Sequence, residues 1–151
     1  MKTPNPRQDR YPTPVRLLAV QALVRVERSP PEEDLLSEDD QHSLSPRDRA
    51  LWQELVLGTL RQRGYLDWLL EQVTARPLRA ASAWVRNTLR LAAYQIVFTR
   101  VPPHASVDEA VRLGKQAGAA GGRFVNAVLR ALLKKKDAMQ PPTRESDPVR
   151  H

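Results

Sequence analysis

Apolar residues recur three and four positions apart along most of the chain, the spacing that places side chains on one face of an α-helix. No segment alternates between apolar and polar residues with the period of two that a half-buried strand shows. The pattern therefore predicts an all-α fold. Six helices are expected, over residues 14–28, 46–60, 66–76, 83–97, 107–117 and 123–136.

Short polar residues mark where several of these helices begin. Ser45 and Ser82 each precede a helical run, where a serine oxygen accepts a hydrogen bond from a free backbone amide. Ser106 stands three residues before Glu109, which is the spacing of a capping box and predicts that the fifth helix begins there. Gly118 is expected to end that helix in a left-handed conformation, and the sixth helix is expected to start after Gly122.

Some positions inside the helices predict how the helices pack. Gly58 costs its helix about 1 kcal/mol relative to alanine, which indicates a close helix crossing. The helix over 83–97 has a broad apolar face and is expected at the centre of the bundle, with Arg86 and Arg90 on its outer side. Trp68 stands among leucines, so we expect it to pack in the core or against a helix; the alternative is an exposed platform on which a base stacks.

The last helix carries a row of cations opposite its apolar stripe. At 100° per residue, Arg123, Arg130 and Lys134 lie within about 40° of one another, and Lys135 and Lys136 extend the row. Cations in a final turn also interact favourably with the helix dipole. Two interpretations are equally supported: a solvated helix face or a phosphate-binding one.

The charge of the chain is uneven. Its 151 residues suit one domain and carry a net charge of +7. Residues 29–44 hold six acidic residues and no Lys or Arg, so removing this −6 leaves +13 on the rest. A small basic body favours a polyanionic partner, and RNA is the one we expect. The acidic stretch is expected to be a solvated loop; the alternative is that it folds over the basic surface and competes with RNA.

Composition excludes several kinds of chemistry. The chain has no Cys, which excludes disulfides, thiolate zinc sites and a cysteine nucleophile. Its three histidines are scattered, so neither a metal site nor a cofactor is expected; His104 is expected at a turn and Asn126 as a buried amide. The glycine-rich residues 114–122 follow no strand and are interpreted as an interhelical turn. No apolar run approaches the ~18 residues that span a bilayer, so we expect a cytoplasmic protein.

Four segments together resemble a known family. Residues 93–113 (AYQIVFTRVPPHASVDEAVRL) and 124–133 (FVNAVLRALL) are similar to the NusB-like RNA-binding domain, as are 48–61 and 66–78. The likeness is greatest to the version at the N-terminus of bacterial small-subunit rRNA cytosine-C5 methyltransferases. It covers 14–136 and implies a compact bundle of two three-helix groups, with about six to seven helices in all. Residues 1–13 are then expected to be a flexible basic arm and 137–151 a disordered tail.

The resemblance implies a non-enzymatic RNA-binding domain that takes rRNA or its nascent transcript. These methyltransferases attack with a cysteine and hold S-adenosylmethionine on a Rossmann-like sheet, and the chain contains neither feature. The family places an arginine cluster in its first helix to grip RNA. In this chain only Arg16 matches that cluster, and Arg7 and Arg10 of the arm are expected to substitute for the others. The expected RNA-binding residues are Arg7, Arg10, Arg16, Arg123, Arg130, Lys134, Lys135 and Lys136.

Other readings of the same residues stay open. The chain could be an antitermination factor of the NusB type, although the sparse arginines of its first helix count against this. It could be the RNA-binding part of a split or truncated methyltransferase, which would need a catalytic partner chain. The family likeness also implies a ribosomal protein as partner. A further alternative is a protein-interaction bundle that forms a homodimer through the apolar helix over 83–97.

Overall fold

A computed structural model describes residues 14–28 and 43–139, and in these ranges the fold consists of six α-helices and two short 3-10 turns. Within those ranges there is no strand, so the predicted all-α class is confirmed. The expected arm, most of the acidic loop and most of the tail lie outside the described residues. In chain order the elements are α1 (Pro14–Arg28), α3 (Pro46–Arg61), α4 (Arg63–Glu71), η2 (Leu78–Ala80), α5 (Ala83–Phe98), α6 (Pro103–Gly114), η3 (Lys115–Ala117) and α7 (Ala119–Met139).

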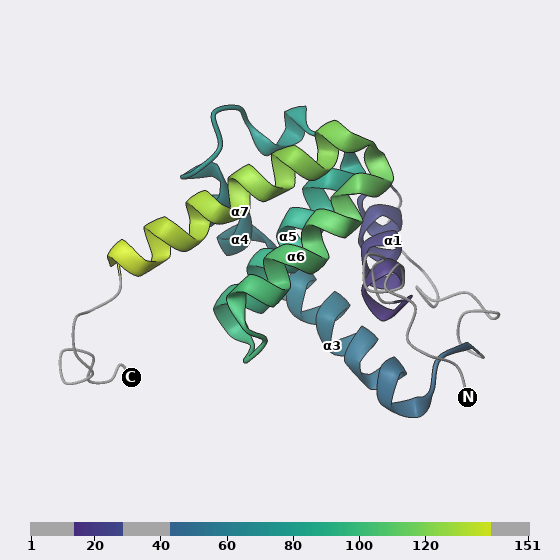
Figure 1. The fold of residues 1–151 in the computed structure, drawn as a ribbon. Helices are drawn as coiled ribbons and strands as arrows, with labels where there is room; N and C mark the ends of the chain where they lie inside the picture. The colour runs from purple at the N-terminus through teal and green to yellow at the C-terminus, as the bar shows by residue number, and fades with distance from the viewer. Residues whose placement is uncertain (1–13, 29–42, 140–151) are drawn as a thin grey trace, which may run out of the picture.

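Helix α5 lies at the centre of the bundle, as the sequence predicts. It touches α1, α3, α4, α6 and α7, which surround it (Figure 1). Every residue from 87 to 96 is buried, so its apolar face is already covered by the chain itself. This face of α5 therefore offers no interface for a homodimer, and a homodimer through another surface stays a prediction. The core also reaches the end of the expected acidic loop, because Leu44 is buried.

The predicted caps at Ser45 and Ser82 are confirmed, and the one at Ser106 is wrong. The Ser45 hydroxyl accepts from the amide of Asp48 at 3.1 Å, and the Ser82 hydroxyl accepts from that of Val85 at 3.2 Å. Helix α6 instead begins a turn earlier, at Pro103, and Ser106 is buried inside it. Proline suits a first helical position because its missing amide has no partner there in any case.

Helices α6 and α7 approach each other through glycines. Gly118 has a φ of 108°, a conformation that only glycine adopts without strain, and it ends the short η3 turn as predicted. Helix α7 starts at Ala119, not after Gly122, because Gly121 packs its backbone against α6: a Cβ on it would lie 2.6 Å from the carbonyl oxygen of Gly114. The helix also continues to Met139, past the predicted end at Lys136.

Arg86 and Arg90 lie inside the bundle, which corrects the prediction that they face outward. Arg90 is 7% exposed and donates through Nε and Nη2 to both oxygens of Asp67 on α4, at 2.7 and 3.0 Å. Its Nη1 donates to Glu27 of α1 at 2.5 Å, and Arg86 holds the same carboxylate at 2.6 and 2.9 Å. We call these four residues the ion cluster. Through these ion pairs, α1 and α4 are both joined to α5.

The ion cluster controls the protonation of Glu27. Hydrogen bonds from Arg86 stabilise its carboxylate, burial opposes this, and hydrogen bonds from Arg90 add to it, so its pKa falls from 4.5 to about 2. The same carboxylate raises the pKa of Arg86. Glu27 in the folded protein therefore stays ionised well below pH 4.5.

Gly58 makes room for an aromatic ring. The predicted helix crossing is with α5, and the Tyr94 side chain of that helix fills the space at Gly58: a Cβ on Gly58 would overlap the Tyr94 hydroxyl and lie 2.7 Å from Cε1 of the same ring. Tyr94 is itself buried and its ring stacks on Phe98 at 5.6 Å. By contrast, a Cβ on Gly64, at the start of α4, would meet nothing within 4 Å.

We expect Gly58→Ala to lower the free energy of unfolding by about 1–3 kcal/mol, because the Tyr94 ring must move to admit the methyl group. Gly64→Ala is the matched control and is expected to raise stability by about 0.5 kcal/mol through the lost flexibility of the unfolded chain. Urea unfolding followed by circular dichroism measures both. A Gly58→Ala protein as stable as the Gly64→Ala protein would contradict the close contact with Tyr94.

We expect the stability contributed by Glu27 to be fully present above pH 4.5 and to be lost as the pH falls toward 2. Over that interval the unfolded chain takes up a proton at Glu27 that the folded chain does not. Wild type should therefore lose about 1–2 kcal/mol more than Glu27→Gln between pH 5 and pH 2, after allowing for solvent screening of this partly exposed carboxylate. Glu54→Gln, which removes an exposed carboxylate of α3, is the control and should follow wild type. Parallel curves for wild type and Glu27→Gln would contradict the assignment.

Candidate nucleic-acid-binding surface

The outer side of α7 carries the predicted row of cations. Arg123, Arg130, Lys134 and Lys135 are exposed, whereas Lys136 is half-buried. At 1.5 Å per residue, Arg130 lies about 10 Å along the axis from Arg123, and Lys134 lies about 6 Å further. Four of the five predicted cations are thus presented to solvent on one helix, and their role as ligands for phosphate stays a prediction.

Asn126 holds Arg130 in place, which corrects its interpretation as a buried amide serving the backbone. The residue is half-buried, and its side-chain oxygen accepts from Nε of Arg130 at 3.0 Å one turn further along α7. This bond uses one of the five donors of the guanidinium. No other described residue accepts from the rest, so they remain available to a bound anion.

A shallow groove runs beside this row on the α6 side. It holds about 470 Å³ and is lined by Val111, Lys115, Ala119, Gly122, Arg123 and Asn126. Lys115 lies here because Gly122 has no side chain: a Cβ on Gly122 would be 2.7 Å from Cγ of Lys115. An exposed lysine therefore joins Arg123 at the groove. Lys115 is not among the site residues predicted from the sequence. The one sequence feature that relates to its position is Gly122, which leaves room for the lysine side chain.

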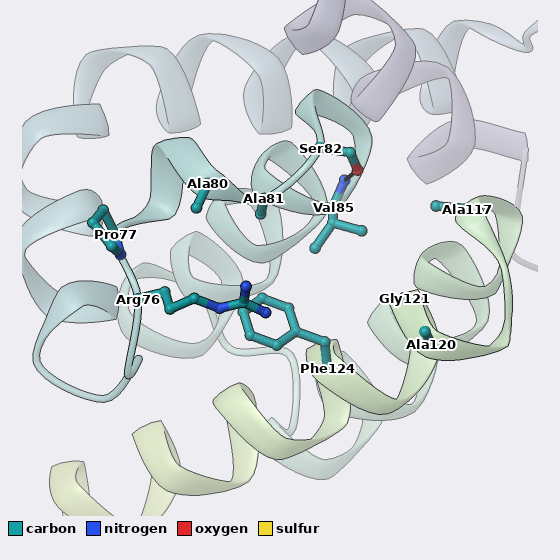
Figure 2. A pocket seen from close by; sticks show the side chains of 10 residues that line it. All are labelled: Arg76, Pro77, Ala80, Ala81, Ser82, Val85, Ala117, Ala120, Gly121 and Phe124. Atoms are coloured by element: carbon teal, nitrogen blue, oxygen red, sulfur yellow. Dashed lines mark hydrogen bonds between the residues drawn. The ribbon is translucent and has the colours of Figure 1, made fainter.

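A second hollow of about 290 Å³ opens on the other side of α7, toward η2 and the first turn of α5 (Figure 2). Arg76, from the segment before η2, and Phe124, from α7, both line this hollow, and small side chains such as Ala81 and Ala120 form the rest of its wall (Figure 2). The hollow thus offers a ligand one cation and one flat apolar face. Neither Arg76 nor Phe124 is among the site residues predicted from the sequence.

Arg16 is not part of this surface. It is half-buried on α1 and donates through Nε to Oε1 of Gln95 at 2.8 Å, near the end of α5. Helix α7 meets the opposite end of α5, where Val85 lies beside Gly121, and ten residues of helix separate Val85 from Gln95, about 15 Å. Figure 1 shows α1 and the last turns of α7 on opposite sides of the bundle. Arg7 and Arg10 lie outside the described residues.

The described residues offer little for catalysis. Across 14–28 and 43–139 no three His, Asp or Glu side chains gather as metal ligands do. His104 is exposed in the first turn of α6. Of the interhelical turn predicted over 114–122, only residues 115–118 lie between α6 and α7, because α7 already begins at Ala119. None of the helices in these ranges is long and apolar enough to cross a membrane. What the surface around α7 provides is cations, one aromatic ring and two hollows.

Known proteins resemble most of this chain. The profile of the NusB family matches residues 13–134. Ribosomal RNA small subunit methyltransferase B of Escherichia coli O1:K1 / APEC is 32% identical over 136 residues, which cover 88% of this chain and 31% of the relative. The probable enzyme of the same name from Bacillus subtilis (strain 168) is 34% identical over 140 residues, again over 31% of its length. The chain therefore spans about a third of these curated relatives, in their N-terminal part.

Solved structures share the fold. NusB of T. maritima superposes with a TM-score of 0.71 and 27% identity, covering 89% of this chain and 94% of that one. A chain from a crystal structure of the antitermination factors NusB and NusE in complex with dsRNA gives a TM-score of 0.71 at 22% identity, over 87% of this chain and 99% of that one. The helical bundle described above is thus the bundle of these proteins.

Proposed function

The chain belongs to the NusB family, and we propose that it is a non-catalytic RNA-binding domain that takes ribosomal RNA on the surface around α7. The observation that carries the proposal is the exposed row of Arg123, Arg130, Lys134 and Lys135 on one helix. The groove with Lys115 and the hollow with Arg76 and Phe124 lie on either side of that helix and extend the contact.

The comparisons support RNA as the partner. The relatives quoted above are named as ribosomal RNA methyltransferases, and one structural neighbour was solved with the antitermination factors and dsRNA. A ribosomal protein or a second copy of the chain remains a candidate additional partner. A domain of this kind works where ribosomal RNA is made, which is the bacterial cytoplasm.

The mechanism is charge neutralisation with release of counterions. Each Lys or Arg that meets a phosphate frees cations condensed on the RNA, so affinity falls as salt rises. For single strands the slope of log K against log salt is about −0.7 per phosphate contact. Arg130 meets phosphate with a guanidinium already held by Asn126, whereas Lys134 and Lys135 act as mobile point charges.

Service in rRNA modification fits the chain better than antitermination. The match to the N-terminal third of the methyltransferases extends over 88% of this chain. Of the expected first-helix arginines only Arg16 is present, and its Nε already bonds Gln95. Because these 151 residues contain no Cys, the attacking cysteine and the S-adenosylmethionine site would come from a methyltransferase domain outside them, in the same or a partner chain.

We expect Arg130→Gln/Lys134→Gln to weaken binding of a small-subunit rRNA fragment and to make the salt slope shallower by about 1.4, if both residues meet phosphate. Fluorescence anisotropy from about 50 to 300 mM salt measures the affinity and the slope together. The variant should unfold like wild type, because both side chains are exposed. A boxA-like RNA measured in parallel separates rRNA recognition from antitermination.

Arg28→Gln/Arg47→Gln is the matched control. It removes the same charge from exposed positions on α1 and α3, neither of which carries a cation of the row on α7. Its slope should stay within about 0.3 of wild type if only long-range attraction is lost. Equal losses in the two double variants would mean that RNA responds to net charge alone, and the proposed surface would then be wrong.

A further inference from the structure

Three large aromatic side chains are exposed together at the end of the bundle where α5 finishes. Trp68 is 51% exposed, Tyr65 46% and Phe98 43%. Among the described residues the only other large apolar side chain as exposed is Leu57. The three rings form one aromatic cluster: the centroid of Tyr65 is 6.0 Å from that of Trp68 and 6.0 Å from that of Phe98. The interpretation of Trp68 as a core residue is therefore wrong.

The exposure of this aromatic cluster follows from helix geometry. On α4, Leu66 and Leu70 point into the core and are fully buried. At 100° per residue, Trp68 lies about 160° from both leucines, and Tyr65 lies at least about 100° from each. The helix therefore cannot bury the two leucines and the two aromatic residues against α5 at the same time. Fixing α4 to α5 through Asp67 and Arg90 therefore commits the two aromatic residues to the surface.

The rings are arranged as an open stack. Tyr65 and Trp68 are close to parallel, with 21° between their planes, and Trp68 ends the row with half of its surface free. Tyr94 and Phe98 form a second stack with 26° between planes, and Phe98 meets Tyr65 edge-on. Tyr94 is anchored by the space at Gly58, so the platform rests on a buried ring and is not a set of loose side chains.

Cations outnumber acids in the sequence that adjoins the aromatic cluster, where the one exposed acid of α4, Glu71, accepts from the amide of Leu78 at 3.4 Å. Residues 55–66 and 95–107 contain Arg61, Arg63 and Arg100 and no Asp or Glu. All three arginines are exposed, and no ion pair joins them to another described residue. The nearest acid on α4, Asp67, is turned inward to Arg90. Aromatic faces with a positive rim match a single-stranded nucleic acid, whose bases are flat and whose backbone is anionic.

We infer that the aromatic cluster is a base-stacking site for single-stranded RNA, in which an unpaired base continues the stack on Trp68 and Arg61, Arg63 and Arg100 meet the flanking phosphates. The inference rests on the proposed function, because it adds a second contact for the same class of ligand. Phe98 lies thirteen helical residues, about 20 Å, from Val85 at the hollow beside α7. The two contacts therefore bind different nucleotides.

The two contacts contribute differently to recognition. The cation row on α7 meets phosphates, which a duplex and a single strand both present. Bases of a duplex are stacked on one another and cannot reach Trp68, so the aromatic cluster selects unpaired segments. Stacking carries no net charge, and its loss should leave the salt dependence unchanged.

The test measures the affinity of wild type, Trp68→Ala, Trp68→Phe and Leu57→Ala for a single-stranded and a duplex rRNA fragment of equal length. We expect Trp68→Ala to bind the single strand about 5- to 100-fold more weakly, with an unchanged salt slope and unchanged duplex affinity. Trp68→Phe should recover most of the loss, and Leu57→Ala, which removes exposed apolar surface without a ring, should bind like wild type. Tryptophan emission should be quenched by the single strand in wild type and not in Trp68→Phe, because Trp52 is buried and Trp84 is bonded to Leu113.

The outcomes separate this inference from the proposed function. If Arg130→Gln/Lys134→Gln weakens RNA binding while Trp68→Ala leaves single-strand affinity unchanged, the stacking site is wrong and the α7 surface stands. If Trp68→Ala and Leu57→Ala both alter self-association in sedimentation and leave RNA affinity unchanged, the aromatic cluster is a protein interface, which also overturns the inference. Wild type that binds neither RNA overturns both proposals.

Discussion

Folding removes the charged side chain of Arg90 almost wholly from water, which costs desolvation free energy. The arrangement of the bundle depends on the ion pairs that offset this cost. A buried charge is tolerated only when it is paired and hydrogen-bonded, and Arg90 obtains both from Asp67 on α4 and Glu27 on α1. Arg86 completes the pairing of Glu27. Three helices distant in sequence must therefore take one mutual position, because a shift in any of them would leave a buried charge unpaired.

That constraint also decides what reaches the surface. Turning Asp67 inward fixes the rotation of α4, and the same rotation places Tyr65 and Trp68 outside. On the far end of α5, the glycines of α6 and α7 set how closely those helices approach, and so place Arg123 and Lys115 beside one groove. The polar interior and the two surfaces proposed for RNA are thus consequences of the same packing.

Features that depend on neighbours in sequence could be predicted, and features that depend on distant partners could not. The caps at Ser45 and Ser82, the all-α class and the row on α7 follow from local spacing. Arg86 and Arg90 look like outward cations on their own helix, because Glu27 lies 59 and 63 residues away. Trp68 has leucines near it in sequence, but on the helix it lies about 160° from the buried Leu66 and Leu70, and it therefore faces solvent. Ser106 has the spacing of a capping box, but the helix begins earlier, at Pro103, because proline is favoured at a first helical position.

The bond from Arg130 to Asn126 has an entropic consequence for the row on α7. A long side chain that becomes fixed on binding costs about 0.5–1.5 kcal/mol of conformational freedom. Arg130 has surrendered part of that freedom during folding, because its Nε is already held at 3.0 Å. Lys134 and Lys135 still have theirs to lose. Although the cations carry equal charge, Arg130 is preorganised, and in the proposed complex it would set the register of the phosphate backbone.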